Sequence, residues 1–234
     1  MRHPLLRPAL ALALALVLGS SFVSLSAKAP AARAPDYAAL IGTFPRPGSD
    51  RYKADVAILV WLQHARTRED IQRAESEVSY RLGIFSAVLG RDLDSGRYPL
   101  TLALGEQARQ DLRAVTAAIK PKFTRQRPFQ AMPRLIKPAI DRENTSSYPS
   151  GHSAWGVMEA MLLVALQPQL QPREQEAILA RGRLVGYDRS LGGVHYPSDV
   201  EAGQKLGAAF AAEWLAEPDH RKLLEEARSA EWQH

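Results

Sequence analysis

The chain has 234 residues, which is enough for one sizeable hydrophobic core. It contains no cysteine, so its composition excludes disulfides, thiolate zinc sites, a cysteine nucleophile and a lipid-modified N-terminal cysteine. The formal net charge is +5, but without Arg2, Arg7 and Lys28 there are 27 basic against 25 acidic residues and the charge falls to +2. We therefore expect no nucleic-acid partner.

Residues 1–29 have the pattern of a secretory signal peptide. A short segment with two arginines precedes an apolar run over residues 9–18, and small residues follow up to Ala29. This pattern predicts a periplasmic or secreted protein. Residues 8–27 carry no charge and are just long enough to cross a bilayer, so an uncleaved membrane anchor is the alternative, and only then is a membrane partner expected.

The rest of the chain divides into an arm and a helical domain. Residues 30–49 are rich in Ala, Pro and Gly, which predicts a linker or an extended N-terminal arm. Over residues 50–234 the hydrophobic periodicity is helical almost throughout. The predicted helices cover residues 51–66, a segment opened by the Thr67–Asp70 capping box, 101–120, 152–166, 172–190, 198–216 and a polar segment from Pro218. The expected fold class is all-α, a single-domain helical bundle.

One predicted helix and one loop stand out in this domain. Residues 152–166 are almost entirely apolar, with Glu159 as their only charge, so they are expected to form the central buried helix. Residues 121–149 contain four prolines before Pro149 and form too long a stretch for a simple connection. Loops of this length are usually functional or disordered.

Three separate groups of residues carry the chemistry. In chain order they are Lys120 with Arg127, then Ser150, Gly151 and His152, and then Arg189 with His195 and Asp199. Each group alone is a weak signal. The chance of finding all three in this order and at these spacings is on the order of one in ten million.

Helical periodicity turns two of these charges toward the core. Arg189 continues the apolar stripe of Ile178 and Val185, and Asp199 heads the stripe of Leu206 and its neighbours. A buried charge has to be paired or bind a ligand, so a bound anion explains the converging basic side chains. The alternative for Arg189 is an ordinary salt bridge with a nearby acid.

The anion expected there is a phosphate. Ser150 and Gly151 stand where the central helix begins, so free backbone N–H groups and the helix dipole favour a phosphate, although a plain Ser-Gly turn has the same appearance. Asp199 lies four residues after His195 and can fix its tautomer, which leaves the other ring nitrogen free to attack phosphorus. His152 can then protonate the departing alkoxide.

Together with the flanking sequences RQRPF (125–129), YPSGHS (148–153) and GVHYPSDV (193–200), these groups resemble the signature of class A bacterial non-specific acid phosphatases. That family lies within the superfamily of type 2 phosphatidic acid phosphatases and vanadium haloperoxidases. The resemblance covers roughly residues 50–232. It implies an exported, metal-independent acid phosphatase without a cofactor, which hydrolyses small phosphomonoesters through a phosphohistidine and has an acidic pH optimum.

The resemblance also assigns roles to the residues. It implies that His195 is the nucleophile, His152 the general acid and Asp199 the group that orients His195. The phosphate oxygens would be bound by five groups, namely Lys120, Arg127, Arg189, Ser150 and the amide of Gly151. Lys120 lies off the apolar stripe of its helix, so Lys122 is the substitute.

The chain departs from the family pattern in two places. The usual serine before Arg189 is replaced by Asp188, and the cysteines that often form a disulfide are missing. Neighbouring helix residues point about 100° apart, so Asp188 is expected to face away from the anion, toward Arg181. Glu159 lies two turns from His152 on the same helix face, so it is expected to be the partner of a buried arginine, with a supporting role behind His152 as the alternative.

Other functions share these residues. A membrane-associated lipid phosphate phosphatase is the alternative if the N-terminal segment is retained, and a vanadate-dependent haloperoxidase is disfavoured because the chain is short for that branch. A non-catalytic phosphate binder is disfavoured because an acid and a nucleophile are both present. The leaving group is expected to contact residues 67–100 and 129–148, while the natural substrate and the oligomeric state stay open.

Overall fold

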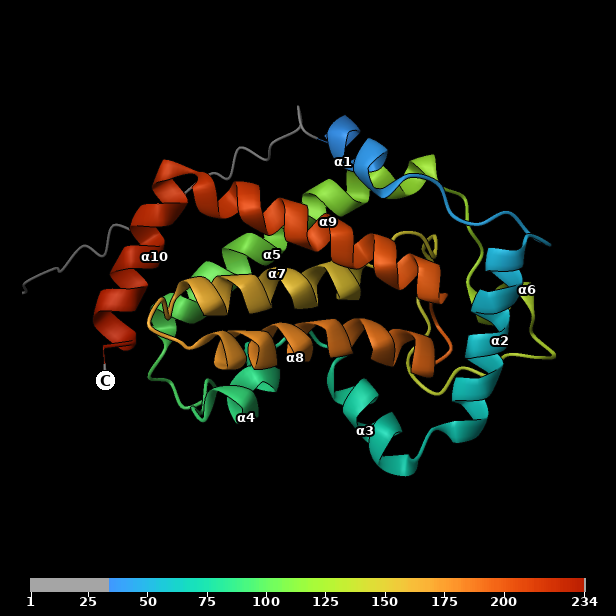
Figure 1. Ribbon diagram of the computed structural model, residues 1–234, viewed down its shortest axis with the longest axis horizontal. Helices are drawn as coiled ribbons and strands as arrows, with labels where there is room; N and C mark the ends of the chain where they lie inside the picture. Colours follow the sequence, from blue (N-terminus) through green and yellow to red (C-terminus); the bar gives the residue numbers. More distant parts are fainter. Residues whose placement is uncertain (1–33, 234) are drawn as a thin grey trace, which may run out of the picture.

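The computed structural model describes residues 34–233, and every regular element within them is a helix (Figure 1). The α-helices are α1 (Ala34–Ile41), α2 (Asp50–Ala65), α3 (Arg68–Ser76), α4 (Ser86–Leu89), α5 (Pro99–Ile119), α6 (Pro128–Ala131), α7 (Gly151–Ala165), α8 (Pro172–Leu191), α9 (Pro197–Ala216) and α10 (Pro218–Glu231). Two short 3-10 helices are η1 (Leu82–Phe85) and η2 (Lys120–Lys122). The predicted all-α fold class is confirmed.

The helix boundaries follow from local chemistry. The long helices begin and end within two residues of their predicted limits. The predicted capping box is present, since the Thr67 side chain accepts from the Asp70 N–H and the Asp70 carboxylate accepts from the Thr67 N–H. Five of the described α-helices, α5, α6, α8, α9 and α10, begin with proline, whose missing N–H costs nothing at that position.

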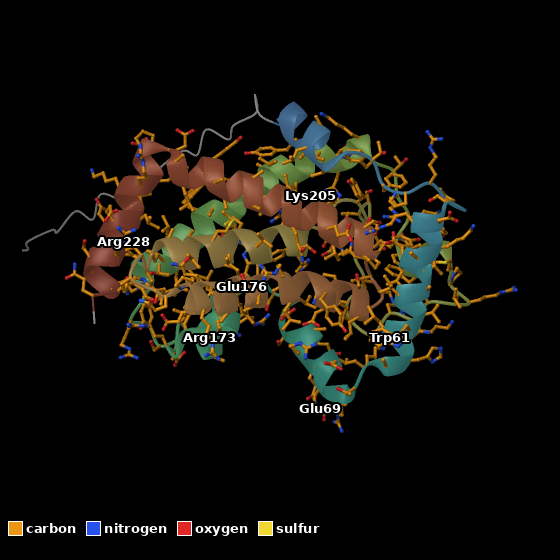
Figure 2. The ribbon with its side chains drawn as sticks, in the orientation of Figure 1. Trp61, Glu69, Arg173, Glu176, Lys205 and Arg228 are labelled. Carbon is orange, nitrogen blue, oxygen red and sulfur yellow. The ribbon has the colours of Figure 1, made fainter. Side chains whose placement is uncertain are left out.

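The predicted central helix, α7, lies between α8 and α9 (Figure 1). Its neighbours approach so closely that glycine is needed at the contacts. A Cβ at Gly182 would lie 2.3 Å from the carbonyl oxygen of Gly156, and a Cβ at Gly207 would lie 2.1 Å from that of Ala154. Arg228 of α10, labelled in Figure 2, donates to the carbonyl oxygen of Ala165 at the end of α7 (2.7 Å).

The chain direction brings three helix ends together. The start of α7, the end of α8 and the start of α9 meet at one end of the bundle, on the right in Figure 1, beside α2. The loop over residues 132–150 lies at the same end. Because α8 runs antiparallel to both α7 and α9, the second and third groups identified in the sequence are brought together at this end.

Part of the segment predicted as a linker or an extended N-terminal arm, residues 30–49, is helical. Residues 34–41 form α1, which packs against α9 and α5. Tyr37 and Ile41 are both buried in the main core, and Tyr148 donates its hydroxyl to the carbonyl oxygen of Ile41 (2.7 Å). Tyr37 and Ile41 stand one helical turn apart, which is the spacing of an apolar helix face. Two residues are too short a pattern to stand out among the surrounding Ala and Pro residues.

The predicted signal peptide, residues 1–29, lies outside the described residues. In the part of the chain that the structure describes, no helix combines the length and the apolar character needed to cross a membrane.

The close contact between α7 and α8 leads to a stability prediction. Alanine favours a helix over glycine by about 1 kcal/mol, yet a methyl group at Gly182 would collide with the backbone of α7. We expect Gly182→Ala to lower the free energy of unfolding by about 1–3 kcal/mol in urea titrations. Ala180→Gly, on the exposed side of α8, serves as the control for propensity alone. A Gly182→Ala protein more stable than the wild type would contradict the packing argument.

Candidate active site

His195 and Asp199 form the first part of the site. Helix α8 ends at Leu191, and Gly193 follows with a φ of +74°, a left-handed conformation that favours glycine. This turn brings His195 back against the start of α9, where Asp199 lies in the first turn. The Nδ1 atom of His195 lies 3.4 Å from Oδ2 of Asp199, and both side chains are buried.

The surroundings of His195 define its tautomer. Its Nε2 lies 3.3 Å from Nη1 of Arg127. A guanidinium can only donate, so Nε2 is the unprotonated nitrogen and the ring proton is on Nδ1, which faces Asp199. The predicted arrangement of a carboxylate behind one ring nitrogen and a lone pair on the other is present.

Asp199 is held by a network that the sequence did not reveal. Its carboxylate accepts from Ser147 Oγ (2.6 Å), from the Tyr196 N–H (2.9 Å) and from Arg125 Nη1 (2.6 Å). Arg125 also contacts the buried carboxylate of Asp55 on α2 (3.2 Å). Burial alone would raise the pKa of Asp199, but its contacts with His195, Arg125 and Ser147 hold that pKa below its ordinary value. The carboxylate therefore stays ionised behind His195.

His152 lies in the first turn of α7 and is also buried. Its Nε2 lies 3.1 Å from the carbonyl oxygen of Val78, which can only accept, so Nε2 carries a proton. Its Nδ1 faces the Tyr80 hydroxyl (3.2 Å) and Oε1 of Glu143 (3.6 Å), and the Tyr80 ring stacks on the imidazole at 4.2 Å. Nδ1 is therefore the atom that His152 presents to the site.

Arg127 connects the two histidines. Besides His195, its guanidinium donates to the carbonyl oxygens of Val194 (3.2 Å) and Thr145 (3.0 Å) and to the Glu143 carboxylate (2.6 Å). Since Glu143 also faces His152, the two imidazoles lie on either side of a single Arg127–Glu143 ion pair. Sequence reasoning found Arg127 but had no signal for Glu143.

Lys120 turns toward the site, whereas Lys122 is exposed. Pro121 ends α5 and the chain continues as a short 3-10 helix, which directs the Lys120 ammonium to the Ser146 carbonyl (2.9 Å) and the Thr145 hydroxyl (3.2 Å). Burial and the Arg127 charge lower the pKa of Lys120 to about 8. Lys120, and not the alternative Lys122, is therefore the lysine that lies beside Thr145 and Ser146.

Arg189 points into the core as predicted, with a hydrogen bond to the carbonyl oxygen of Ala74. Its Nε is buried and has no hydrogen-bond partner among residues 34–233. The nearest acid in the sequence, Asp188, forms two 2.8 Å hydrogen bonds with Arg73 of α3 instead. The expectation that Asp188 faces Arg181 is wrong, because Arg181 pairs with Glu77 (2.7 Å). Arg189 therefore keeps donor capacity for an anion.

The start of α7 forms the wall of the same site. Ser150 is the N-cap residue of α7, and its side chain accepts from the Ser153 N–H (3.3 Å). Gly151 borders the adjoining cavity, and a Cβ there would point toward the Tyr80 hydroxyl, 3.7 Å away. Phosphate binding by Ser150 and by the Gly151 amide stays a prediction.

A cavity of about 740 Å³ opens beside Lys120, Gly151 and Glu143. Its walls are largely apolar and aromatic, with Tyr80, Phe123, Trp155, Leu112, Ala117 and Pro121, and two arginines of α5, Arg109 and Arg113, also line it. The contribution of Tyr80 and of residues 143–146 agrees with the expected leaving-group regions, whereas α5 was not expected to take part. Such a cavity suits an apolar group attached to an anion.

Burial keeps both imidazoles neutral in the free protein. It lowers the pKa of His195 to about 4, against the opposing effect of Asp199. Burial and the Arg189 charge lower the pKa of His152 to about 3, although Glu143 acts in the opposite direction. His195 can therefore serve as a nucleophile at mildly acidic pH, and His152 needs a nearby negative charge to hold a proton.

Glu159 does not pair with an arginine as expected. It accepts a hydrogen bond from the Trp155 indole (2.9 Å), and its Oε2 has no hydrogen-bond partner in the described part of the chain. Burial raises the pKa of Glu159 to about 8.

Residues 34–233 contain no group of three or more His, Asp or Glu side chains that could hold a metal ion. Metal independence stays a prediction.

The described residues form an all-helical bundle with two imidazoles beside three basic side chains at one end. Comparison with known proteins places this chain in a family. A family model described as "PAP2 superfamily" matches residues 100–221. The chain is 32% identical over 168 residues to the non-specific acid phosphatase of Salmonella typhimurium, which covers 70% of this chain and 65% of that protein. It is 30% identical over 160 residues to the acid phosphatase of Zymomonas mobilis, covering 67% and 59%.

A further relative and a solved structure extend the comparison. The non-specific acid phosphatase of Providencia stuartii is 33% identical over 116 residues, 48% of this chain and 45% of that protein. The transmembrane PAP2 type phosphatidylglycerolphosphate phosphatase from Bacillus subtilis has a similar fold, with a TM-score of 0.53 over 82% of this chain and 92% of that one. At 20% sequence identity this likeness concerns the fold alone.

The chain belongs to the PAP2 superfamily, because the family model covers more than half of it. The resemblance drawn from the three motifs is confirmed. The chain spans between 45% and 65% of the length of these curated relatives.

The burial of Glu159 leads to a prediction of pH-dependent stability. Its pKa in the folded protein is about 8, above its ordinary value, so its contribution to stability is present at pH 4 and lost as the pH rises toward 8. Glu159→Gln imitates the protonated form. We expect equal stability of mutant and wild type near pH 4. Between the ordinary pKa and about pH 8 the mutant should gain about 1.4 kcal/mol per pH unit, and the difference should level off above that range.

Urea titrations at several pH values measure this difference. Glu106→Gln, which changes an exposed glutamate of α5, serves as the matched control and should show no such gain. A constant difference between Glu159→Gln and the wild type at all pH values would show that Glu159 does not titrate in this range.

Proposed function

We propose that this protein is an exported acid phosphatase that hydrolyses phosphomonoesters through a phosphohistidine at His195, without a metal. One observation supports this most strongly. Each imidazole has one nitrogen held by a protein acceptor, Asp199 or the Val78 carbonyl, and presents the other nitrogen to the same Arg127–Glu143 pair. Export rests on the sequence pattern of residues 1–29.

In the first step, Nε2 of His195 attacks phosphorus while the bond from phosphorus to the leaving oxygen breaks. Arg127, Arg189 and Lys120 neutralise the charge on the three remaining oxygens, which carry most of the negative charge in such a transition state. His152 transfers its Nδ1 proton to the leaving oxygen, so the product leaves as an alcohol. Asp199 stabilises the positive charge that develops on His195.

In the second step, water attacks the phosphohistidine. His152, now neutral at Nδ1, accepts the proton of that water, and the bond between phosphorus and His195 Nε2 breaks to release phosphate. The same group thus acts as an acid and then as a base, which restores the starting protonation states. The low pKa of His195, about 4, keeps the nucleophile available at the acidic pH expected for this reaction.

The nucleophile provides the direct test. We expect His195→Ala to reduce kcat for para-nitrophenyl phosphate by at least about a thousandfold, because both steps proceed through that nitrogen. The rates are measured with excess EDTA and without it, and the wild type is expected to keep its activity with the chelator. His64→Ala, which removes an exposed histidine of α2, is the control.

Two results would reject this mechanism. Unchanged turnover in His195→Ala would exclude a phosphohistidine at this position. Complete loss of wild-type turnover in EDTA, restored by a divalent metal, would exclude metal-independent hydrolysis.

The cavity beside Lys120 is the proposed leaving-group site. Ala117 lines it, while Ala118 is the next residue on the exposed surface of α5. We expect Ala117→Trp to lower kcat/KM for an aryl phosphate by about tenfold, since it fills space that the aryl group needs. Ala118→Trp should have no effect. The inhibition constant of inorganic phosphate, which lacks a leaving group, should not change in either variant, and equal losses in both would contradict the assignment.

A further inference from the structure

The loop between α6 and α7 places a negative charge inside the candidate site. Oε2 of Glu143 lies 2.6 Å from Nη2 of Arg127, and Oε1 lies 3.6 Å from Nδ1 of His152. The Thr145 hydroxyl, 3.4 Å from Oε2 of Glu143, also accepts from Lys120 (3.2 Å). Glu143 thus contacts Arg127, which the proposed reaction assigns to the phosphoryl group, and His152, which it assigns to the leaving oxygen.

A phosphoryl group and this carboxylate exclude one another. Both are anions that would need the same donors of Arg127 and the same face of His152. Two negative charges within about 4 Å of each other repel. A substrate can therefore bind in the proposed way only after the Glu143 carboxylate has moved.

The surrounding loop allows that movement. The Glu143 side chain is 43% exposed and borders the open cavity, and its neighbours Arg142 and Asn144 are exposed. The residues that follow are fixed, because the Thr145 carbonyl accepts from Arg127 and the Ser147 N–H donates to the Arg125 carbonyl (2.9 Å). Rotation of one side chain is enough, and the rest of the site stays in place.

We propose that Glu143 is an internal competitor of the phosphoryl group: it occupies the phosphate position in the free enzyme and is displaced by substrate. This inference rests on the proposed function. In the free enzyme Glu143 pairs with Arg127, whose guanidinium is 1% exposed and would otherwise be a buried, uncompensated charge. After hydrolysis the returning carboxylate favours release of the phosphate product.

The electrostatics of the loop agree with this role. Burial alone would raise the pKa of Glu143, but the charge of Arg127, those of His152 and His195 once they are protonated at low pH, and the charge of Lys120 lower it to about 2. The carboxylate is therefore ionised throughout the acidic range in which the enzyme is expected to work, so it competes with substrate at every working pH.

The test is the affinity for inorganic phosphate, measured by calorimetry on the full chain. Glu143→Gln keeps the size of the side chain and removes its charge. We expect the Kd for phosphate to fall by about tenfold, with a parallel fall in KM for para-nitrophenyl phosphate. We also expect a lower Tm than the wild type without phosphate, because Arg127 loses its ion pair, and a larger rise of Tm on addition of phosphate.

Asp141→Asn is the matched control, because it removes one exposed negative charge from the same loop. If both variants bind phosphate equally more tightly than the wild type, the effect is long-range electrostatics and the proposal is overturned. Glu143→Ala removes the carboxylate in a second way and should also bind phosphate more tightly. Unchanged or weaker phosphate binding in both Glu143 variants overturns the proposal.

The binding measurement separates this inference from the proposed function. Tighter phosphate binding in the Glu143 variants, with no ester hydrolysed by any form of the protein, supports the competitor and rejects the phosphatase. Normal hydrolysis with unchanged phosphate affinity rejects the competitor and leaves the phosphatase. Phosphate binding by neither the wild type nor the variants contradicts both.

Discussion

Three basic side chains, Arg127, Arg189 and Lys120, converge on one end of a helical bundle, and their charge has to be compensated there. A guanidinium that is 1–2% exposed, as for Arg127 and Arg189, is strongly destabilising unless hydrogen bonds or an anion compensate it. The protein supplies backbone carbonyls to all three and one carboxylate, Glu143, to Arg127. The donor capacity that remains, such as Nε of Arg189, faces no acceptor within the described residues. The site is organised around an anion that the polypeptide itself replaces only in part.

Other buried charges around the site have acidic or basic partners within the protein. These pairs hold the helices in place, whereas Arg127, Arg189 and Lys120 keep donors for an anion. Arg125 lies between Asp55 and Asp199, and Asp188 takes two hydrogen bonds from Arg73. These pairs connect α2, α3, α8 and α9 at the end where the site lies. They fix the position of Asp199 behind His195. Asp188, at the position where the family resemblance implies a serine, therefore connects α8 to α3.

Much of the fold could be predicted because its signals are local. Capping boxes, first-turn prolines and apolar stripes define where helices begin, end and face, and the three motifs could be identified because their spacing within a helix or turn is fixed. The missed features depend on long-range packing. Ser147 and Tyr80 lie in segments with no periodic pattern, and Asp55 lies in a predicted helix whose packing partner periodicity does not reveal. Their roles arise only when α2 and the loop pack against α9 and α7. Asp188 was assigned to Arg181 on helical spacing, but α3 supplies a better partner.

The two imidazoles differ in what controls their charge, and this difference orders the proposed reaction. His195 is neutral above about pH 4 because it is buried, with Arg127 opposing Asp199. The pKa of His152, about 3 in the free protein, is lowered by burial and Arg189 and raised by the carboxylate of Glu143. The phosphoryl group of a monoester, bound in place of that carboxylate, is a monoanion in solution below about pH 6 and a dianion above it. Arg127, Arg189 and Lys120 favour the dianion in the site, and its larger negative charge raises the pKa of His152 further. His152 therefore gains its proton together with the substrate, so the acid is formed only when there is a leaving group to protonate.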